Sequence, residues 1–259
     1  MSTGIGAGIS PVFELKPGAS VAPGFLCPTP YSIEFDGLTE RGKTNGAALP
    51  ILGQSGTGDF TISFWFKLPD VTGGGVNQRF MQVGGSGTNW TIIFRGADGK
   101  AQFTGPWSDV GNYVFTNNTW FHLAYSVDRS GLAKWVVNGQ LQDTKNVSAE
   151  TSVFDNVGIL YLGSSASTNQ LFEGNLTQIA FWDKALSASE LLELYNNTDG
   201  KCYGSDFSFS SNLKNYWSCF NPGGVFTNPL EDTAGSGVAT DIPLINMNAT
   251  NVSTDTPLP

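Results

Sequence analysis

Alternating apolar and polar positions recur along most of the chain and predict a protein built from β-strands. In DFTISFWFK (59–67) every second residue from Phe60 to Phe66 is apolar, which is the two-residue period of a strand with one face in a core. The intervening residues, Trp65 among them, form the opposite face. The same period predicts strands in YSIEFDG (31–37), NWTIIFRG (89–96), WFHLAYSVD (120–128), LAKWVVNG (132–139), VGILYLG (157–163), NLTQIAFW (175–182), LKNYWSCF (213–220) and DIPLINM (241–247).

One stretch, FEGNLTQIAFWDKALSASELLELYNN (172–197), changes its period halfway. Its first half alternates as a strand does. In its second half Ser187 and Glu190 have the spacing of a capping box, which predicts a short helix near 188–196. We expect this helix to act as a latch whose buried side is formed by Leu191, Leu192 and Tyr195.

Short turns join the predicted strands, and no alternation of strands with helices is seen. Asn138-Gly139 has the composition of a type I′ hairpin turn, and the chain contains 32 glycines and 13 prolines. These features predict an all-β fold, an antiparallel jelly-roll sandwich. We expect residues 1–30, rich in Gly, Pro and Ser, to form an extended arm, 31–200 the sandwich, and 201–259 further strands or a docking arm of the same sandwich.

Charge excludes some classes of partner. Charged residues make up 14% of the chain, the net charge is −9, and basic residues are not clustered. We therefore expect no nucleic-acid binding and no attraction to anionic membranes. Apolar runs are too short for insertion into a membrane. The N-terminal stretch lacks the pattern of a signal peptide, so synthesis in a cytoplasm is expected.

The chain has three cysteines, Cys27, Cys202 and Cys219. An odd number without a signal peptide predicts buried thiols rather than a disulfide framework, although a Cys202–Cys219 bridge stays open.

Several motifs, taken in order, resemble the laminin-G-like branch of the concanavalin A-like lectin/glucanase superfold. They are the strand around Trp65, the W-x-H-φ-A strand at 120–124, the V-N-G turn, the LYLG strand, and a closing strand followed by an A-L-S-x-x-E-φ helix ending in Tyr-Asn. The resemblance covers about 31–197 and implies a concanavalin A-like jelly roll.

The C-terminal stretch LKNYWSCFNPGG…EDTAGSG…DIPLINM (213–247) resembles part of the laminin-G-like virion proteins of tailed phages. The match is partial, because Ser218 to Asn221 replace an R-φ-G-D portion and Ile242-Pro243 replace a Gly-Thr pair. The resemblance implies a virion protein made in the host cytoplasm.

Catalytic chemistry finds little support in the residues. Some members of the superfold place alternating carboxylates beside a glycosidic bond. The nearest match here is Glu34, Asp36 and Glu40, but Gly37 ends the strand before Glu40, and we interpret Asp36 as a turn residue. His122 is the only histidine and is expected to be structural. We therefore predict no enzymatic activity.

Two kinds of binding site stay open. Relatives hold Ca²⁺ through oxygen ligands in rim loops, but Thr177 stands where the family pattern has an acidic residue. We expect no cofactor, with Asp36, Asp128 and Asp155 as the remaining candidates for calcium. A sugar platform of aromatic rings would use Trp65, Trp90, Trp107 and Trp135, with the alternative that the chain's own arms cover the face that carries Trp65.

Two hypotheses of function follow. The first is a non-enzymatic virion structural protein of a tailed phage, a capsid-decoration or tail/fibre protein that mediates surface adhesion. Its partners would be a major capsid or tail protein, with assembly into a homo-oligomer or lattice through extended arms. The second is a carbohydrate-binding, lectin-like module with a glycan as its partner. An endoglycosidase ranks below both because the carboxylate arrangement is missing.

Overall fold

The computed structural model describes residues 31–45, 58–84, 90–152, 158–197, 203–218, 230–234 and 241–257. The segment 1–30, Asp155 and the three cysteines lie outside these residues, so the expectations placed on them stay predictions.

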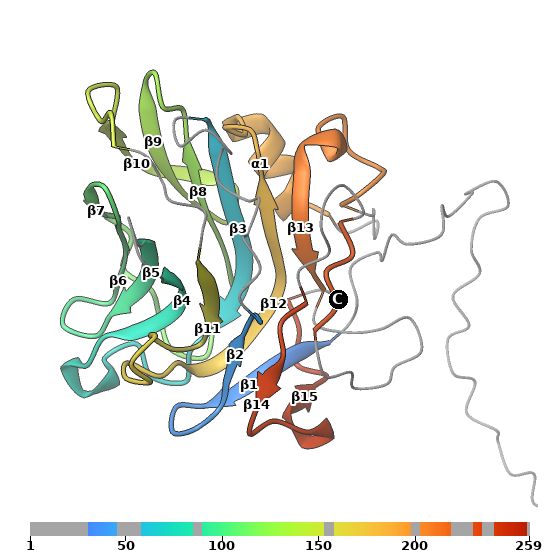
Figure 1. Cartoon of the computed structure of the whole chain (residues 1–259). Helices are drawn as coiled ribbons and strands as arrows, with labels where there is room; N and C mark the ends of the chain where they lie inside the picture. Colours follow the sequence, from blue (N-terminus) through green and yellow to red (C-terminus); the bar gives the residue numbers. More distant parts are fainter. Residues whose placement is uncertain are drawn as a thin grey trace, which may run out of the picture.

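Two antiparallel sheets pack face to face, as the alternation in the sequence predicts (Figure 1). The first has eight strands, in the order β10-β9-β8-β3-β12-β1-β15, with β13 also paired to β12. These strands are β1 (Ser32–Asp36), β3 (Phe60–Lys67), β8 (Phe121–Val127), β9 (Leu132–Val137), β10 (Gln140–Asn146), β12 (Glu173–Trp182), β13 (Leu213–Trp217) and β15 (Val252–Ser253).

The second sheet has seven strands, in the order β14-β2-β11-β4-β5-β6-β7. They are β2 (Arg41–Lys43), β4 (Gln78–Gly84), β5 (Trp90–Arg95), β6 (Lys100–Thr104), β7 (Ser108–Val110), β11 (Ile159–Leu162) and β14 (Leu244–Ile245). One α-helix, α1 (Ala188–Tyr195), and three short 3-10 helices, Gly73–Gly75, Ser210–Asn212 and Ala249–Asn251, complete the described part of the chain. The all-β sandwich with one short helix is confirmed.

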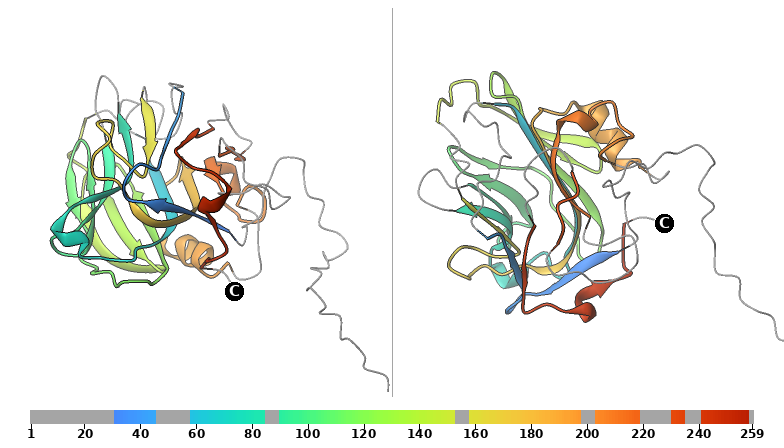
Figure 2. Two further views of the ribbon diagram at one scale, coloured as in Figure 1. Left: turned by 90° about the horizontal axis from the view of Figure 1, so that it is seen from below. Right: turned by 45° about the vertical axis from the view of Figure 1, so that its right-hand side comes forward.

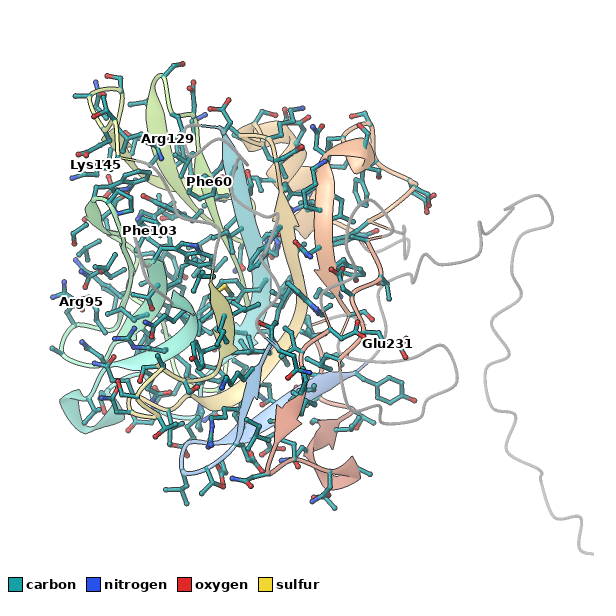
Figure 3. All side chains as sticks on the ribbon, viewed as in Figure 1. Phe60, Arg95, Phe103, Arg129, Lys145 and Glu231 are labelled. Carbon is teal, nitrogen blue, oxygen red and sulfur yellow. The ribbon has the colours of Figure 1, made fainter. Side chains whose placement is uncertain are left out.

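The main core fills the space between the sheets. Phe60 to Phe66 of β3 and Phe121 to Val127 of β8 send every second side chain into it, which confirms the predicted faces. Phe60 meets Phe103 of β6 across this space, with ring centroids 6.4 Å apart (Figure 3). Buried apolar area of this kind is the dominant favourable term in folding.

A second apolar cluster covers the outer face of the eight-stranded sheet. Ala124 of β8 and Trp182 of β12 belong to it, together with residues of α1 and of 203–216. Figure 2 shows α1 packed outside this sheet, on the side opposite the seven-stranded sheet. The central strands are therefore buried on both faces, which explains why Thr61, Ser63 and Ser126 are buried although the alternation marks them as polar.

The predicted capping box of α1 is present. Glu190 N donates to Ser187 Oγ, and Ser187 N donates to Glu190 Oε2 at 2.8 Å. The predicted buried side of the helix is partly wrong. Leu191 and Leu194 are buried, whereas Leu192 is 36% exposed.

The C-terminal segment contributes to both sheets. β13 pairs with β12, β14 pairs with β2, and β15 pairs with β1. Figure 1 shows α1 beside the upper part of the eight-stranded sheet and β1 with β15 at its lower end. The helix thus covers only part of the outer face of this sheet. In the described residues, no helix is long and apolar enough to cross a membrane.

Candidate functional site: a polar pocket on the eight-stranded sheet

The four tryptophans proposed as a sugar platform do not form one. Trp65 is 6% exposed, and Trp90, Trp107 and Trp135 are buried as well. Trp90, Trp107 and Trp135 lie in the main core. Trp65 lies on the outer face, where Tyr195 of α1 stacks on it. The platform is a wrong prediction, because Trp90, Trp107 and Trp135 lie in the main core and α1 covers Trp65.

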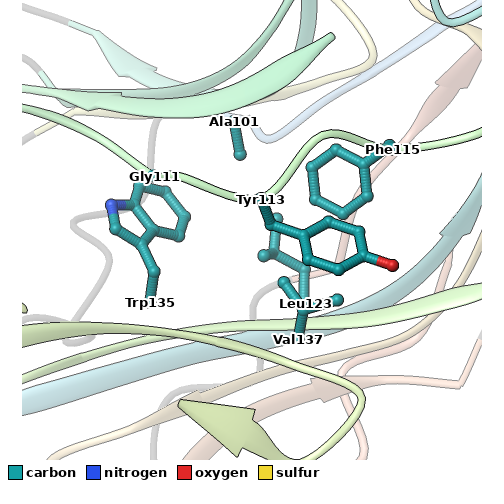
Figure 4. A pocket seen from close by; sticks show the side chains of 7 residues that line it. All are labelled: Ala101, Gly111, Tyr113, Phe115, Leu123, Trp135 and Val137. Carbon is teal, nitrogen blue, oxygen red and sulfur yellow. The ribbon is translucent and has the colours of Figure 1, made fainter. Parts of the chain in front are cut away.

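A small hollow beside Trp135 does not change this conclusion. It measures about 10 Å³ and is lined by apolar side chains between the sheets, including Tyr113, Leu123 and Val137 (Figure 4). A volume of this size holds about one water molecule. The hollow is a packing gap, far too small for a sugar.

The proposed calcium ligands do not come together either. Asp36 ends β1 opposite Glu173, near the Lys67 end of β3, whereas Asp128 follows Val127, which pairs with Phe60 at the other end of β3. Asp36 Oδ1 accepts hydrogen bonds from the amides of Leu38, Thr39 and Glu40. Burial acts to raise the pKa of this carboxyl, but these hydrogen bonds outweigh it and the pKa is lowered.

Asp128 is likewise used by its own turn, since its Oδ1 accepts from Ser130 N and Ser130 Oγ. Among the described residues, no group of three or more His, Cys, Asp or Glu side chains has the geometry to hold a metal ion.

The carboxylates considered for catalysis are also committed to the β1–β2 turn. Glu40 Oε2 accepts from Asp36 N, and Glu40 Oε1 accepts from Asn251 Nδ2. Asp36 and Glu40 therefore fix the turn around Gly37, which has φ +71°. Glu34 remains as an exposed carboxylate on β1.

Strand register places a row of polar residues across the outer face of the eight-stranded sheet. Glu34 of β1 is opposite Asn175 of β12, and Asn175 is opposite Lys67 of β3. Phe66 of β3 is paired with Phe121 of β8, and the two strands are antiparallel. Lys67, the residue after Phe66, therefore lies opposite Trp120, the residue before Phe121. Lys67 Nζ lies 5.8 Å from the centroid of the Trp120 ring. On the same face, the neighbouring pair of this row along β3 and β8 is Trp65 and His122, which α1 covers.

A pocket of about 300 Å³ opens at this row. Its lining is polar and comes from β1, β12, the end of β3 and the C-terminal segment. The lining residues are Glu34, Phe35, Asp36, Lys67, Pro69, Asn118, Glu173, Gly174, Asn175, Ser253 and Asp255.

Asp255 fixes the C-terminal wall of the pocket to the sheet. Its Oδ1 accepts from Trp120 Nε1 at 2.8 Å, and its Oδ2 is paired with Lys67 Nζ. Ser32 Oγ donates to the carbonyl oxygen of Asp255 at 2.7 Å. The half-buried ring of Trp120 is therefore held in a fixed orientation beside the pocket.

Several polar groups of the pocket are acceptors that the described residues leave free. The side chains of Glu34 and Glu173 are exposed, and no described residue hydrogen-bonds to their carboxylates. Asn175 is 7% exposed, and its Nδ2 donates to Ser32 Oγ at 3.2 Å. The amide oxygen of Asn175 has no donor within the described part of the chain. The pocket can thus accept hydrogen bonds from a ligand rich in O–H or N–H groups.

The sequence pattern pointed to Glu34 only as a carboxylate of the strand at 31–37 and did not predict this site. One signal was available: Trp120 has the same alternation as His122 in WFHLAYSVD, so it had to face outward. The contribution of Asp255 had no signal, because it depends on how the C-terminal segment crosses the sheet.

His122 is a structural residue of the covered part of this face. It is fully buried, with its ring centroid 5.2 Å from that of Trp65. Neither ring nitrogen has a hydrogen-bond partner in the described residues. Burial lowers the pKa of His122 from 6.5 to about 3, so the ring is neutral at physiological pH.

Two solved structures are similar to this chain. A "putative carbohydrate binding protein" from Bacteroides ovatus aligns with 90% of this chain at 18% identity and a TM-score of 0.62, and the chain spans 62% of that protein's length. A heptameric SAP-like pentraxin from Limulus polyphemus aligns with 64% of the chain, covering 82% of its own, at 12% identity and a TM-score of 0.49. No curated protein sequence matches.

The family model of the Concanavalin A-like lectin/glucanases superfamily matches residues 41–192, more than half of the chain. This range runs from β2 into α1 and so contains most strands of both sheets and the start of the latch helix. The chain therefore belongs to the concanavalin A-like lectin/glucanases superfamily.

Proposed function

We propose that this protein is a non-enzymatic carbohydrate-binding module that holds a sugar in the polar pocket on its eight-stranded sheet. The observation that carries the proposal is the combination of the 300 Å³ pocket with the half-buried ring of Trp120, which lies outside the lining but contacts two lining residues, Asp255 and Lys67. Ligand pockets begin at about this volume. Family membership and the name of the Bacteroides ovatus protein agree with this function.

Each group would have a defined part in binding. The Trp120 ring offers an apolar face against which the C–H groups of a sugar ring can pack. Glu34, Glu173 and the oxygen of Asn175 accept hydrogen bonds from sugar hydroxyls. Lys67 and Asp255 hold the Trp120 ring and are not available for proton transfer, because each is already paired with the other. Their part is therefore to orient the ring that the sugar packs against.

A glycan array followed by calorimetric titration of each hit tests the proposal. Trp120→Ala should weaken binding at least about tenfold, because it removes the aromatic face against which the sugar ring packs. Tyr161→Ala is the matched control. Tyr161 is a half-buried ring on the seven-stranded sheet with Lys43 Nζ 5.9 Å from its centroid, so it repeats the Lys67–Trp120 arrangement on the other face. Binding lost in Tyr161→Ala and kept in Trp120→Ala would place the site elsewhere.

The virion hypothesis stays a prediction. Its N-terminal arm, 1–30, lies outside the described residues. Part of the phage-like tail, β13 and β14, pairs within the two sheets. Docking through the arm would be tested by deleting residues 1–30 and measuring incorporation into an assembled particle; incorporation at the level of the complete chain would refute it.

A further inference from the structure

The pocket combines free acceptors with a surplus of negative charge. Glu34, Asp36, Glu173 and Asp255 line it, and Lys67 is its one basic lining residue. Lys67 is already paired with Asp255. An anionic ligand would find no free cation in this lining and would be repelled by the carboxylates.

Two of these carboxylates are placed to act together. Glu34 is opposite Asn175, and Glu173 is two residues from Asn175 on the same strand, so Glu34 and Glu173 are diagonal neighbours on one face. Diagonal residues of an antiparallel pair lie about 7–8 Å apart. A positively charged group between them could bind both carboxylates at once.

An independent feature also points to a ligand that donates hydrogen bonds. Asn175 lies between Glu34 and Lys67 in the row and lines the pocket. It is only 7% exposed. Its Nδ2 is used by Ser32, and its oxygen is left without a donor among the described residues. The oxygen is not among the fully buried side-chain atoms that lack a partner, so a donor on the ligand could bind it from the pocket.

We infer that the pocket takes an amino sugar with a free, protonated amine, in preference to an N-acetylated or an acidic sugar. The inference rests on the proposed function and narrows its ligand class. The ammonium group would lie between Glu34 and Glu173 and donate to the oxygen of Asn175, while the sugar ring packs beside Trp120. An acetyl group removes the charge, and a uronic acid reverses it.

The test titrates the complete chain with three oligosaccharides by calorimetry: a glucosamine oligomer with free amines, its fully N-acetylated counterpart, and a galacturonic acid oligomer. The pH is set so that the amines are protonated. We expect the free-amine oligomer to bind at least about tenfold more tightly than the N-acetylated one, and the galacturonic acid oligomer not to bind. Added salt should reduce this preference.

Variants locate the effect. Glu34→Gln and Glu173→Gln should each weaken binding of the free-amine oligomer about fivefold. Glu193→Gln, which removes the same charge from an exposed position on α1 outside the pocket lining, should leave it unchanged. Thermal unfolding of each variant confirms that the sandwich is folded.

The outcomes separate the two proposals. Equal binding of the free-amine and N-acetylated oligomers, or an equal effect of Glu193→Gln, would overturn the amino-sugar inference and leave carbohydrate binding in place. Absence of binding to these oligomers and to every glycan of the array would overturn both.

Discussion

Tyr195, on the last turn of α1, stacks on Trp65 of β3 with ring centroids 5.6 Å apart and ring planes 25° from parallel. This contact joins the latch helix to the centre of the eight-stranded sheet. It also covers the one tryptophan on the outer face that alternation had marked as a ligand platform. The helix therefore divides this face into a covered part at Trp65 and an open part at Trp120.

Loss of the stacking ring should loosen the helix. We expect Tyr195→Ala to lower the free energy of unfolding by about 2 kcal/mol, since it removes a half-buried ring and an aromatic pair. Tyr195→Phe keeps the ring and should be within about 0.5 kcal/mol of the original chain. Urea unfolding followed by tryptophan fluorescence measures both. Equal losses in the two variants would show that the hydroxyl, and not the stacking, holds the helix.

The hairpin turn between β9 and β10 packs against the same helix, α1. Asn138 and Gly139 have φ of 50° and 70°, which confirms the predicted type I′ turn. A Cβ added at Gly139 would lie 2.7 Å from Leu192 Cδ1 and 3.0 Å from Leu192 Cα. Glycine is thus required twice, for its positive φ and for the close approach of α1.

We expect Gly139→Ala to cost about 2–3 kcal/mol of unfolding free energy, from the left-handed backbone and the clash together. Gly74 is the matched control, because it has φ +61° and nothing within 4 Å of an added Cβ. Gly74→Ala should cost only about 1 kcal/mol, for the backbone alone. The difference between the two variants in thermal unfolding measures the contact with α1. If both lose the same stability, the turn does not support the helix.

Patterns within one element were enough to predict the sandwich, the faces of β3 and β8, the type I′ turn and the capping box. The contacts between elements could not be predicted from such patterns. Leu194 of α1 is buried in the outer cluster, whereas Leu192 lies against Gly139 of the β9–β10 turn and stays 36% exposed. The alternation within a strand likewise does not predict which other element covers the outer face of that strand.

The pocket illustrates the same limit. Alternation places Glu34 and Trp120 on outward faces, but only strand register brings them into one row with Asn175 and Lys67. The fold could therefore be predicted from local periods, whereas the site needed strand order and the path of the C-terminal segment.

Stability should depend on pH through His122. The folded protein protonates this ring only near pH 3, whereas the unfolded chain does so near pH 6.5. Between these values the unfolded state binds more protons, so the free energy of unfolding falls as pH falls, by up to about 1.4 kcal/mol per pH unit. Above about pH 6.5 the contribution of His122 to the free energy of unfolding no longer changes with pH.

The measurement is urea unfolding at a series of pH values from neutral down to about pH 3, on the original chain and on His122→Leu, which cannot titrate. Carboxylates titrate in both proteins, so the difference between the two slopes isolates His122. We expect the variant to lose less stability on acidification. Parallel curves would mean that the ring is accessible to protons in the folded state.

The last prediction concerns the attachment of the C-terminal segment. Asp255 accepts from Trp120 Nε1 and pairs with Lys67, so both bonds hold the segment that follows β15 against the end of β3 and the start of β8. The Asp255 side chain is 46% exposed and that of Lys67 is 17% exposed, so the pair is partly screened and contributes at most about 1 kcal/mol. Its loss should therefore open the segment locally without unfolding the sandwich.

We expect Asp255→Ala to speed amide hydrogen exchange at Val252 and Ser253, while amides of β3 and β8 keep their protection. Asp255→Asn retains an oxygen that can accept from Trp120 Nε1 but removes the charge that attracts Lys67. Its exchange rates should therefore lie between those of the original chain and those of Asp255→Ala. Added salt should raise exchange in the original chain and have little effect in either variant, because only the original chain has an ion pair to screen. Unchanged exchange in Asp255→Ala would show that the β1–β15 pairing alone holds the wall of the pocket.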